Sequence, residues 1–133
     1  MSFQTKLVTD ADWASEVGKP AADGQQPGES GCPGYLQVVD CHSDWCGPCN
    51  AIQGTFKRIY FEFGDRPLKF YTANVDKIAC LSKYRGTAQP TFLFYQDNEM
   101  LECITGVDAP KLQAAIMEMM PGGEEEEEET PAA

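Results

Sequence analysis

The chain lacks the features of a membrane-spanning or secreted protein. No apolar run in its 133 residues approaches the roughly 18 residues that a transmembrane helix requires. The opening residues, MSFQTKLVTDADW, contain no apolar stretch typical of a signal peptide. We therefore expect one compact domain in the cytoplasm or a space continuous with it, where thiols stay reduced.

Positive charge is also scarce. Lysine and arginine number 10 against 21 aspartate and glutamate residues, so the net charge is −11. This balance argues against binding to nucleic acid or to an anionic membrane. Glutamates are concentrated in the run 124–129, and like charges keep such a run extended. We expect residues 122–133 to form a disordered acidic tail.

Metal ligands are few. The chain holds one histidine, and of its six cysteines only Cys46 and Cys49 form a CxxC pair. A zinc ribbon needs a second such pair or a pair of histidines, so zinc is the weaker interpretation and we expect neither metal nor cofactor. Six cysteines in a reducing compartment do not indicate a disulfide framework either. We expect Cys32 to be exposed, and Cys41 and Cys103 to be buried.

Apolar periodicity predicts strands that alternate with helices. Strands are predicted at 4–8, 35–40, 68–75, 91–95 and 100–105. Helices are predicted at 11–17, from Cys46 to Gly64, from a cap at Asp76 to Gly86, and from a cap at Asp108 to Met119. The order βαβαβα followed by ββα predicts an α/β fold, with a mixed central β-sheet flanked by helices on both faces. Residues 19–34 form a Pro/Gly-rich loop, either a tolerated insertion or a contact surface for a partner.

The segment WCGPC, residues 45–49, falls between the second predicted strand and its helix. A thiolate at a helix N-terminus meets unsatisfied N–H groups and the positive end of the helix dipole, and both stabilise the anion. We therefore predict that Cys46 is the attacking thiolate and that Cys49, one turn further in, is the resolving thiol. Gly47 and Pro48 separate them, and Pro48 stiffens the loop. A CxxC pair beside a βαβ pattern indicates redox chemistry.

Two segments, VVDCHSDWCGPC and AQPTFLFY, resemble the thioredoxin family, and the domain that carries them spans residues 1–121. The resemblance implies the thioredoxin fold. It also implies that Asp40 is a buried carboxylate beneath the cysteines, which takes the proton of the inner thiol through water. From the residues alone, Asp40 fits a strand-end cap as well. Many thioredoxins carry a lysine near this aspartate, where this chain has Thr72.

The same resemblance assigns three supporting residues. Pro90 matches a proline that follows a cis peptide bond and faces the disulfide, where freed backbone groups can pair with an extended substrate. Gly106 matches a glycine that leaves room for that substrate. Trp45 matches an aromatic residue that shields the site, although its residue type also fits an ordinary core position.

A narrower resemblance is carried by KYRG (83–86), PTFLFY (90–95) and GVDAPKLQ (106–113). These segments are similar to thioredoxin-type light chains of axonemal outer-arm dynein and to thioredoxin modules fused to nucleoside diphosphate kinase domains. The resemblance implies a subunit bound to a dynein heavy or intermediate chain in the axoneme of a cilium or flagellum. Its dithiol would exchange with partner thiols and disulfides. A general cytosolic thioredoxin and a non-enzymatic dynein assembly subunit are the alternatives.

Overall fold

A computed structural model describes residues 3–22, 24–44, 50–86 and 89–121. A five-stranded sheet with the order β1-β3-β2-β4-β5 forms its centre. The strands are β1 (Gln4–Leu7), β2 (Leu36–His42), β3 (Leu68–Asn74), β4 (Thr91–Gln96) and β5 (Glu99–Thr105). The helices are α1 (Asp10–Glu16), α2 (Asn50–Phe63), the 3-10 helix η1 (Ala79–Tyr84) and α3 (Ala109–Met119). The predicted acidic tail, 122–133, lies outside the described residues.

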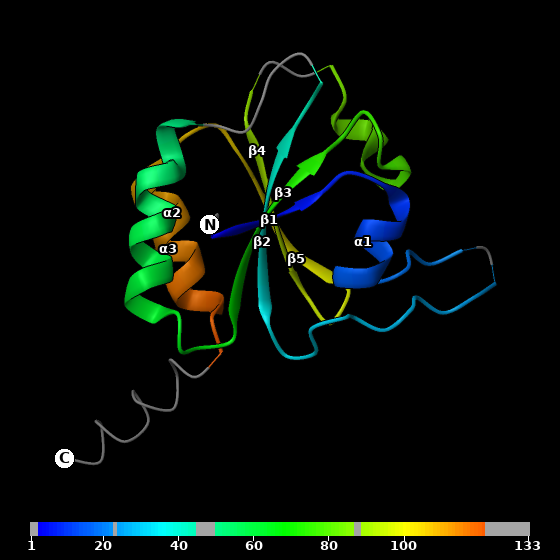
Figure 1. Cartoon of the computed structure of the whole chain (residues 1–133), viewed down its shortest axis with the longest axis horizontal. Helices are drawn as coiled ribbons and strands as arrows, with labels where there is room; N and C mark the ends of the chain where they lie inside the picture. The colour runs from blue at the N-terminus through cyan, green and yellow to red at the C-terminus, as the bar shows by residue number, and fades with distance from the viewer. Residues whose placement is uncertain (1–2, 23, 45–49, 87–88, 122–133) are drawn as a thin grey trace.

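The predicted mixed sheet is confirmed. Strands β1 and β2 pair parallel with β3, whereas β4 pairs antiparallel with β2 and with β5. The helices α2 and α3 cover one face, and α1 and η1 lie on the other (Figure 1). No helix in the described ranges is long and apolar enough to cross a membrane.

The core has one apolar layer on each face of the sheet. On the α2 side, the ring of Phe56 lies 5.0 Å from Phe70 and 5.7 Å from Phe92, centroid to centroid. On the α1 side, Trp13 is buried and meets Tyr95 edge-on. Because successive strand residues point to opposite faces, the continuous apolar run of β2 supplies both layers.

Helix α1 begins at a capping box that the sequence allowed for. Thr9 accepts a hydrogen bond from the Asp12 backbone N–H, and the Asp12 carboxylate accepts one from the Thr9 N–H. The neighbouring Asp10 carboxylate accepts from the Ala79 N–H at 2.7 Å, so it supports the start of η1 from across the fold.

The expected helix after Asp76 is wrong in extent and in its cap. Residues 79–84 form only a short 3-10 helix, and its N-cap is Ile78, which makes no side-chain cap bond. The Asp76 carboxylate instead accepts a hydrogen bond from the Asp44 N–H at 2.7 Å. The Asp76 carboxylate thus serves a contact with another loop, which local periodicity does not reveal.

The Pro/Gly-rich loop folds back along α1. Gly31 donates to the Glu16 carbonyl, and a Cβ at Gly31 would clash with the Ser15 carbonyl oxygen. Asn98, in the β4–β5 turn, donates to the carbonyls of Lys19 and Gly28 at 2.9 and 2.8 Å. These contacts tie both ends of the loop to the body of the domain.

The expectation that Cys32 is exposed is wrong, because the loop carries it onto the sheet. Cys32 is buried, with 9% of its surface exposed. Its sulfur lies among side chains from α1 and β3, which are distant in sequence.

Replacement of Phe56 by alanine tests the core on the α2 side. We expect Phe56→Ala to lower the free energy of unfolding by about 3–5 kcal/mol, because it leaves a cavity between Phe70 and Phe92. The matched control is Phe61→Ala on the same helix, whose ring is 71% exposed and should cost less than about 0.5 kcal/mol. Urea unfolding of both variants is the measurement, and equal losses would contradict the assigned packing.

Candidate functional site

The segment 45–49 lies outside the described residues, but both of its flanks are described. Strand β2 ends at His42, and α2 begins at Asn50, directly after Cys49. The roles predicted for Trp45, Cys46, Gly47, Pro48 and Cys49 therefore remain predictions. The structure does describe the residues on both sides of this segment.

A polar network fixes the chain just before this segment. Asn74 Nδ2 donates to Asp44 Oδ1 at 2.7 Å, and the Asp44 N–H donates to the Asp76 carboxylate at 2.7 Å. The Asp76 N–H donates in turn to Asn74 Oδ1 at 2.9 Å. Lys77 adds an ion pair with Asp44 at 4.0 Å, which its exposure makes weak. The loop after β3 thus holds the chain two residues before Cys46.

This network was not predicted from the sequence. Asp44 is 30 residues from Asn74 and 32 from Asp76, in another loop. The available signal was the position of Asp44 two residues ahead of Cys46, together with polar residues at the end of the next parallel strand. Such ends meet at one edge of a sheet.

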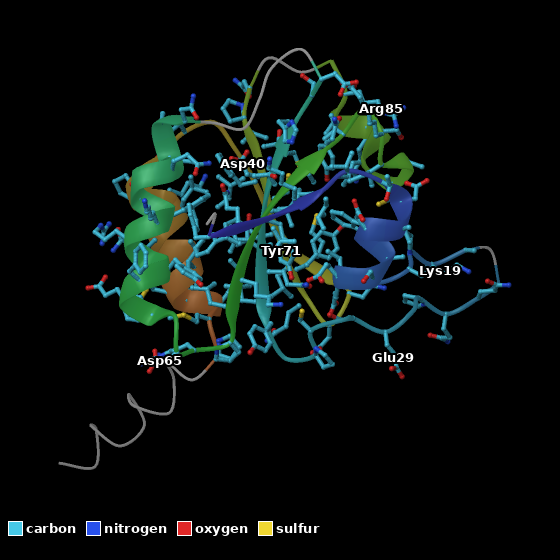
Figure 2. The ribbon with its side chains drawn as sticks, in the orientation of Figure 1. Lys19, Glu29, Asp40, Asp65, Tyr71 and Arg85 are labelled. Atoms are coloured by element: carbon cyan, nitrogen blue, oxygen red, sulfur yellow. The ribbon has the colours of Figure 1, made fainter. Side chains whose placement is uncertain are left out.

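Asp40 is a buried carboxylate, as predicted. Its side chain is fully buried in β2, opposite Thr72 on β3 and Phe92 on β4 (Figure 2). Strand alternation places Asp40 on the same face as Val38, which packs in the layer beneath α2. Asp40 therefore lies on the face that carries the helix following Cys49. A strand-end cap role is disfavoured, because Cys41 and His42 continue the strand beyond it.

Pro90 and Gly106 lie at the same end of the sheet. Cys41 pairs with Thr91, and Thr91 pairs with Thr105, so the residues just outside these pairs are neighbours. The Gly106 N–H donates to the Pro90 carbonyl at 2.8 Å. The structure thus brings Asp40, Pro90 and Gly106 to the edge from which residues 45–49 leave β2.

Two details of these residues differ from expectation. No cis peptide bond occurs among the described residues, which include Gln89 and Pro90. The expected cis bond before Pro90 is therefore wrong for this structure, which has the trans isomer that X–Pro bonds generally favour. Gly106 has φ +88°, and a Cβ there would meet no atom of the described residues within 4 Å. As far as the described part of the chain goes, glycine is required by backbone conformation rather than by lack of space.

The remaining thiols of the described residues differ in exposure. Cys41 is buried, and burial together with the Asp40 carboxylate raises the pKa of its thiol well above the ordinary range. Cys41 therefore stays protonated and packs as a small apolar group, as predicted. Cys103 was expected to be buried but is exposed, because it lies on the edge strand β5. No group of three or more potential metal ligands was found among the described residues.

Comparison with known proteins identifies this arrangement. The sequence model of the family described as Thioredoxin matches residues 33–118. The chain belongs to the thioredoxin family. The mixed five-stranded sheet and the helices around it form its thioredoxin fold.

Two relatives and one solved structure illustrate the similarity. The chain is 40% identical over 119 residues to the 14 kDa flagellar outer-arm dynein light chain of Chlamydomonas reinhardtii. The aligned region covers 90% of this chain and 83% of that relative. It is 49% identical over 87 residues to a thioredoxin domain-containing protein 3 homolog of Ciona intestinalis, of which it spans only 13%. Fasciola hepatica thioredoxin superposes with a TM-score of 0.64 at 28% identity, covering 86% of this chain and 98% of that one.

Alanine at Gly106 tests the backbone requirement. We expect Gly106→Ala to lower the free energy of unfolding by about 1–2 kcal/mol, because φ +88° is unfavourable for an L side chain. Gly54→Ala is the matched control, since Gly54 lies exposed within α2 and a Cβ there has open space. That change should raise the free energy of unfolding by about 0.5–1 kcal/mol. Chemical denaturation of both variants measures these changes in the free energy of unfolding. Changes of the same sign in both variants would contradict the backbone requirement at Gly106.

Proposed function

We propose that this protein is a thioredoxin-type light chain of flagellar or ciliary outer-arm dynein whose Cys46–Cys49 dithiol exchanges with disulfides of partner proteins. The observation that carries the proposal is the frame of the CGPC segment. The segment follows a buried strand and precedes a helix in the sequence, and Asp40, Pro90 and Gly106 lie at the same end of the sheet as the last residues of that strand. These are the elements that a dithiol exchange site requires.

The proposed reaction has two steps. The Cys46 thiolate attacks one sulfur of a partner disulfide, so that a mixed disulfide forms and the other partner sulfur leaves as a thiolate. Cys49 then loses its proton, for which we propose the buried Asp40 as the base, and attacks the Cys46 sulfur. The partner leaves with two reduced thiols, and Cys46–Cys49 becomes a disulfide. The two electrons that reduce the partner come from this dithiol, so no cofactor is needed for the exchange.

The relatives support the motor assignment. The similarity to the Chlamydomonas light chain spans 90% of this chain, which includes the region before the family match. On this basis the partners are dynein heavy or intermediate chains, and the location is the axoneme within the cytoplasm. The net charge of −11 favours attachment through other dynein subunits rather than through acidic tubulin.

A non-enzymatic assembly subunit is the second candidate. The observation in its favour is the loop 19–34, whose ends are hydrogen-bonded to the body of the domain through Gly31 and Asn98. A long loop held in place is a suitable docking surface, and docking alone would not need the thiols. A general cytosolic thioredoxin would instead turn over with NADPH and thioredoxin reductase.

Trapping of the mixed disulfide tests the proposed exchange. In Cys49→Ser the resolving thiol is absent, so Cys46 should stay bound to its partner after incubation with axonemal extract. The matched control is the double variant Cys46→Ser, Cys49→Ser, which keeps the fold but has no attacking thiol. We expect discrete dynein chains to be released by reductant from the single variant only, as identified by mass spectrometry.

Other outcomes separate the candidates. If folded Cys49→Ser captures no more than the double variant, the redox proposal fails. If both variants bind the same dynein chains, and reductant releases none, the assembly subunit is supported. Efficient turnover with NADPH and thioredoxin reductase, without capture of dynein chains, would favour the general thioredoxin.

A further inference from the structure

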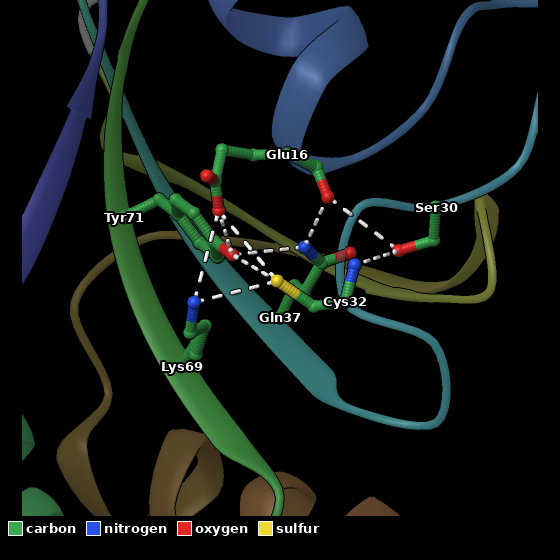
Figure 3. A network of polar contacts seen from close by, with 6 residues as sticks. All are labelled: Glu16, Ser30, Cys32, Gln37, Lys69 and Tyr71. Carbon is green, nitrogen blue, oxygen red and sulfur yellow. Dashed lines mark hydrogen bonds and ion pairs between the residues drawn. The ribbon is translucent and has the colours of Figure 1, made fainter.

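A second group of chemically active side chains lies at the opposite end of β2 from Asp40. It joins α1, the loop 19–34 and strands β2 and β3 (Figure 3). The side chains of this group, which we call the Cys32 cluster, are Glu16, Cys32, Gln37, Lys69 and Tyr71. Nothing in the proposed dithiol exchange uses them, so the inference stands independently of that function.

The Cys32 sulfur is surrounded by groups that bear on its reactivity. Lys69 Nζ donates to Sγ at 3.4 Å. The thiol donates toward Glu16 Oε1 at 3.6 Å, and the Tyr71 hydroxyl lies 3.7 Å from the sulfur. A cation therefore stands where negative charge would develop on the sulfur, and a carboxylate stands where its proton would go.

Lys69 carries a positive charge within this cluster. Burial alone would lower the pKa of Lys69, but its hydrogen bond to Cys32 and the charges of Cys32 and Glu16 raise it overall, so the amine stays an ammonium. The Lys69 and Glu16 side chains are 42% and 30% exposed, whereas Cys32 is 9% exposed. The charged side chains that flank Cys32 are therefore open to water.

Gln37 supplies an independent sign that a further hydrogen-bond donor would be favourable in the cluster. Its Nε2 donates to the Glu16 carbonyl and to the Tyr71 hydroxyl, which fixes the orientation of the amide. The amide points into the cluster (Figure 3), and Gln37 is fully buried. Its Oε1 has no hydrogen-bond partner among the described residues. A buried acceptor of this kind costs about 1–3 kcal/mol unless a donor reaches it.

We propose that Cys32 is a regulatory thiol that small hydroperoxides oxidise to a sulfenic acid. The sulfur attacks the terminal peroxide oxygen, so an S–O bond forms while the O–O bond breaks. The thiol proton passes by way of Glu16 to the leaving oxygen, which departs as an alcohol, or as water from hydrogen peroxide. Cys32 is oxidised by two electrons and the peroxide is reduced by two. The new sulfenic group adds an O–H donor to the cluster in which the Gln37 oxygen is buried.

The modification has a structural consequence. Ser30 Oγ accepts from the Cys32 N–H at 3.0 Å, so Cys32 sits within the turn that returns the loop to β2. An added oxygen must displace neighbours in a cluster whose atoms are already in contact. Oxidation therefore alters how residues 24–34 lie against α1, and thiols that reduce the sulfenic acid restore the original contacts.

The other thiols provide an internal comparison. Cys80 and Cys103 are exposed, so they should react first if accessibility governs oxidation. Partial burial and the Asp10 carboxylate raise the pKa of Cys80, which disfavours its thiolate. The charged groups around Cys32 predict instead that Cys32 is oxidised faster than the more exposed Cys80 and Cys103.

Site-resolved oxidation kinetics test the proposal. The full chain carrying Cys46→Ser and Cys49→Ser is treated with hydrogen peroxide, quenched in denaturant with a sulfenic-specific cyclic dione, and mapped by peptide mass spectrometry. We expect Cys32 to be labelled faster than Cys80 and Cys103. Lys69→Met should slow Cys32 by about tenfold or more, because it removes a charge-assisted hydrogen bond, while Lys69→Arg should retain most of the rate.

Lys111→Met on α3 is the control for loss of a lysine and should leave the Cys32 rate unchanged. Labelling of Cys80 and Cys103 ahead of Cys32 would overturn the proposal, and this comparison does not require any Lys69 variant to fold. An unchanged Cys32 rate in folded Lys69→Met would overturn it as well.

Discussion

The pairing of β2 along both of its edges is the constraint on which the rest of the structure depends. The strand is hydrogen-bonded to parallel β3 on one side and to antiparallel β4 on the other, from Gln37 to Cys41. Its side chains supply both core layers, so a slip of one residue would exchange the two faces and expel the apolar residues from each. This register fixes Asp40 on the face covered by α2 and fixes Gln37 near the other end of the strand.

The two chemically active regions follow from this geometry. At the carboxyl end of β2, the loops after three strands converge, and the network centred on Asn74 holds the chain ahead of the CGPC segment. At the amino end, Gln37 and Tyr71 from adjacent strands receive Cys32 from the loop 19–34. A buried carboxylate such as Asp40 is costly inside a domain unless neighbouring groups compensate it, whereas a buried thiol packs as a small apolar group.

The sequence predicted what local pattern encodes. Strand alternation, the stripe that includes Phe56 and the CxxC spacing gave the sheet, the helices and the motif, because each depends on residues a few positions apart. The sequence did not predict the burial of Cys32, which depends on Lys69 and Tyr71 nearly forty residues away. Asp76 was misassigned as a cap for the same reason, since its partner is in another loop.

The central claim is that Cys46 and Cys49 form a working dithiol, and redox equilibration tests it most directly. The full chain is incubated over a series of dithiothreitol redox buffers, quenched with acid, alkylated and mapped by mass spectrometry. The account predicts a single two-electron transition in which Cys46 and Cys49 gain and lose one disulfide together. If these two cysteines stay reduced across the series, or if either one pairs with a different cysteine, the account is contradicted.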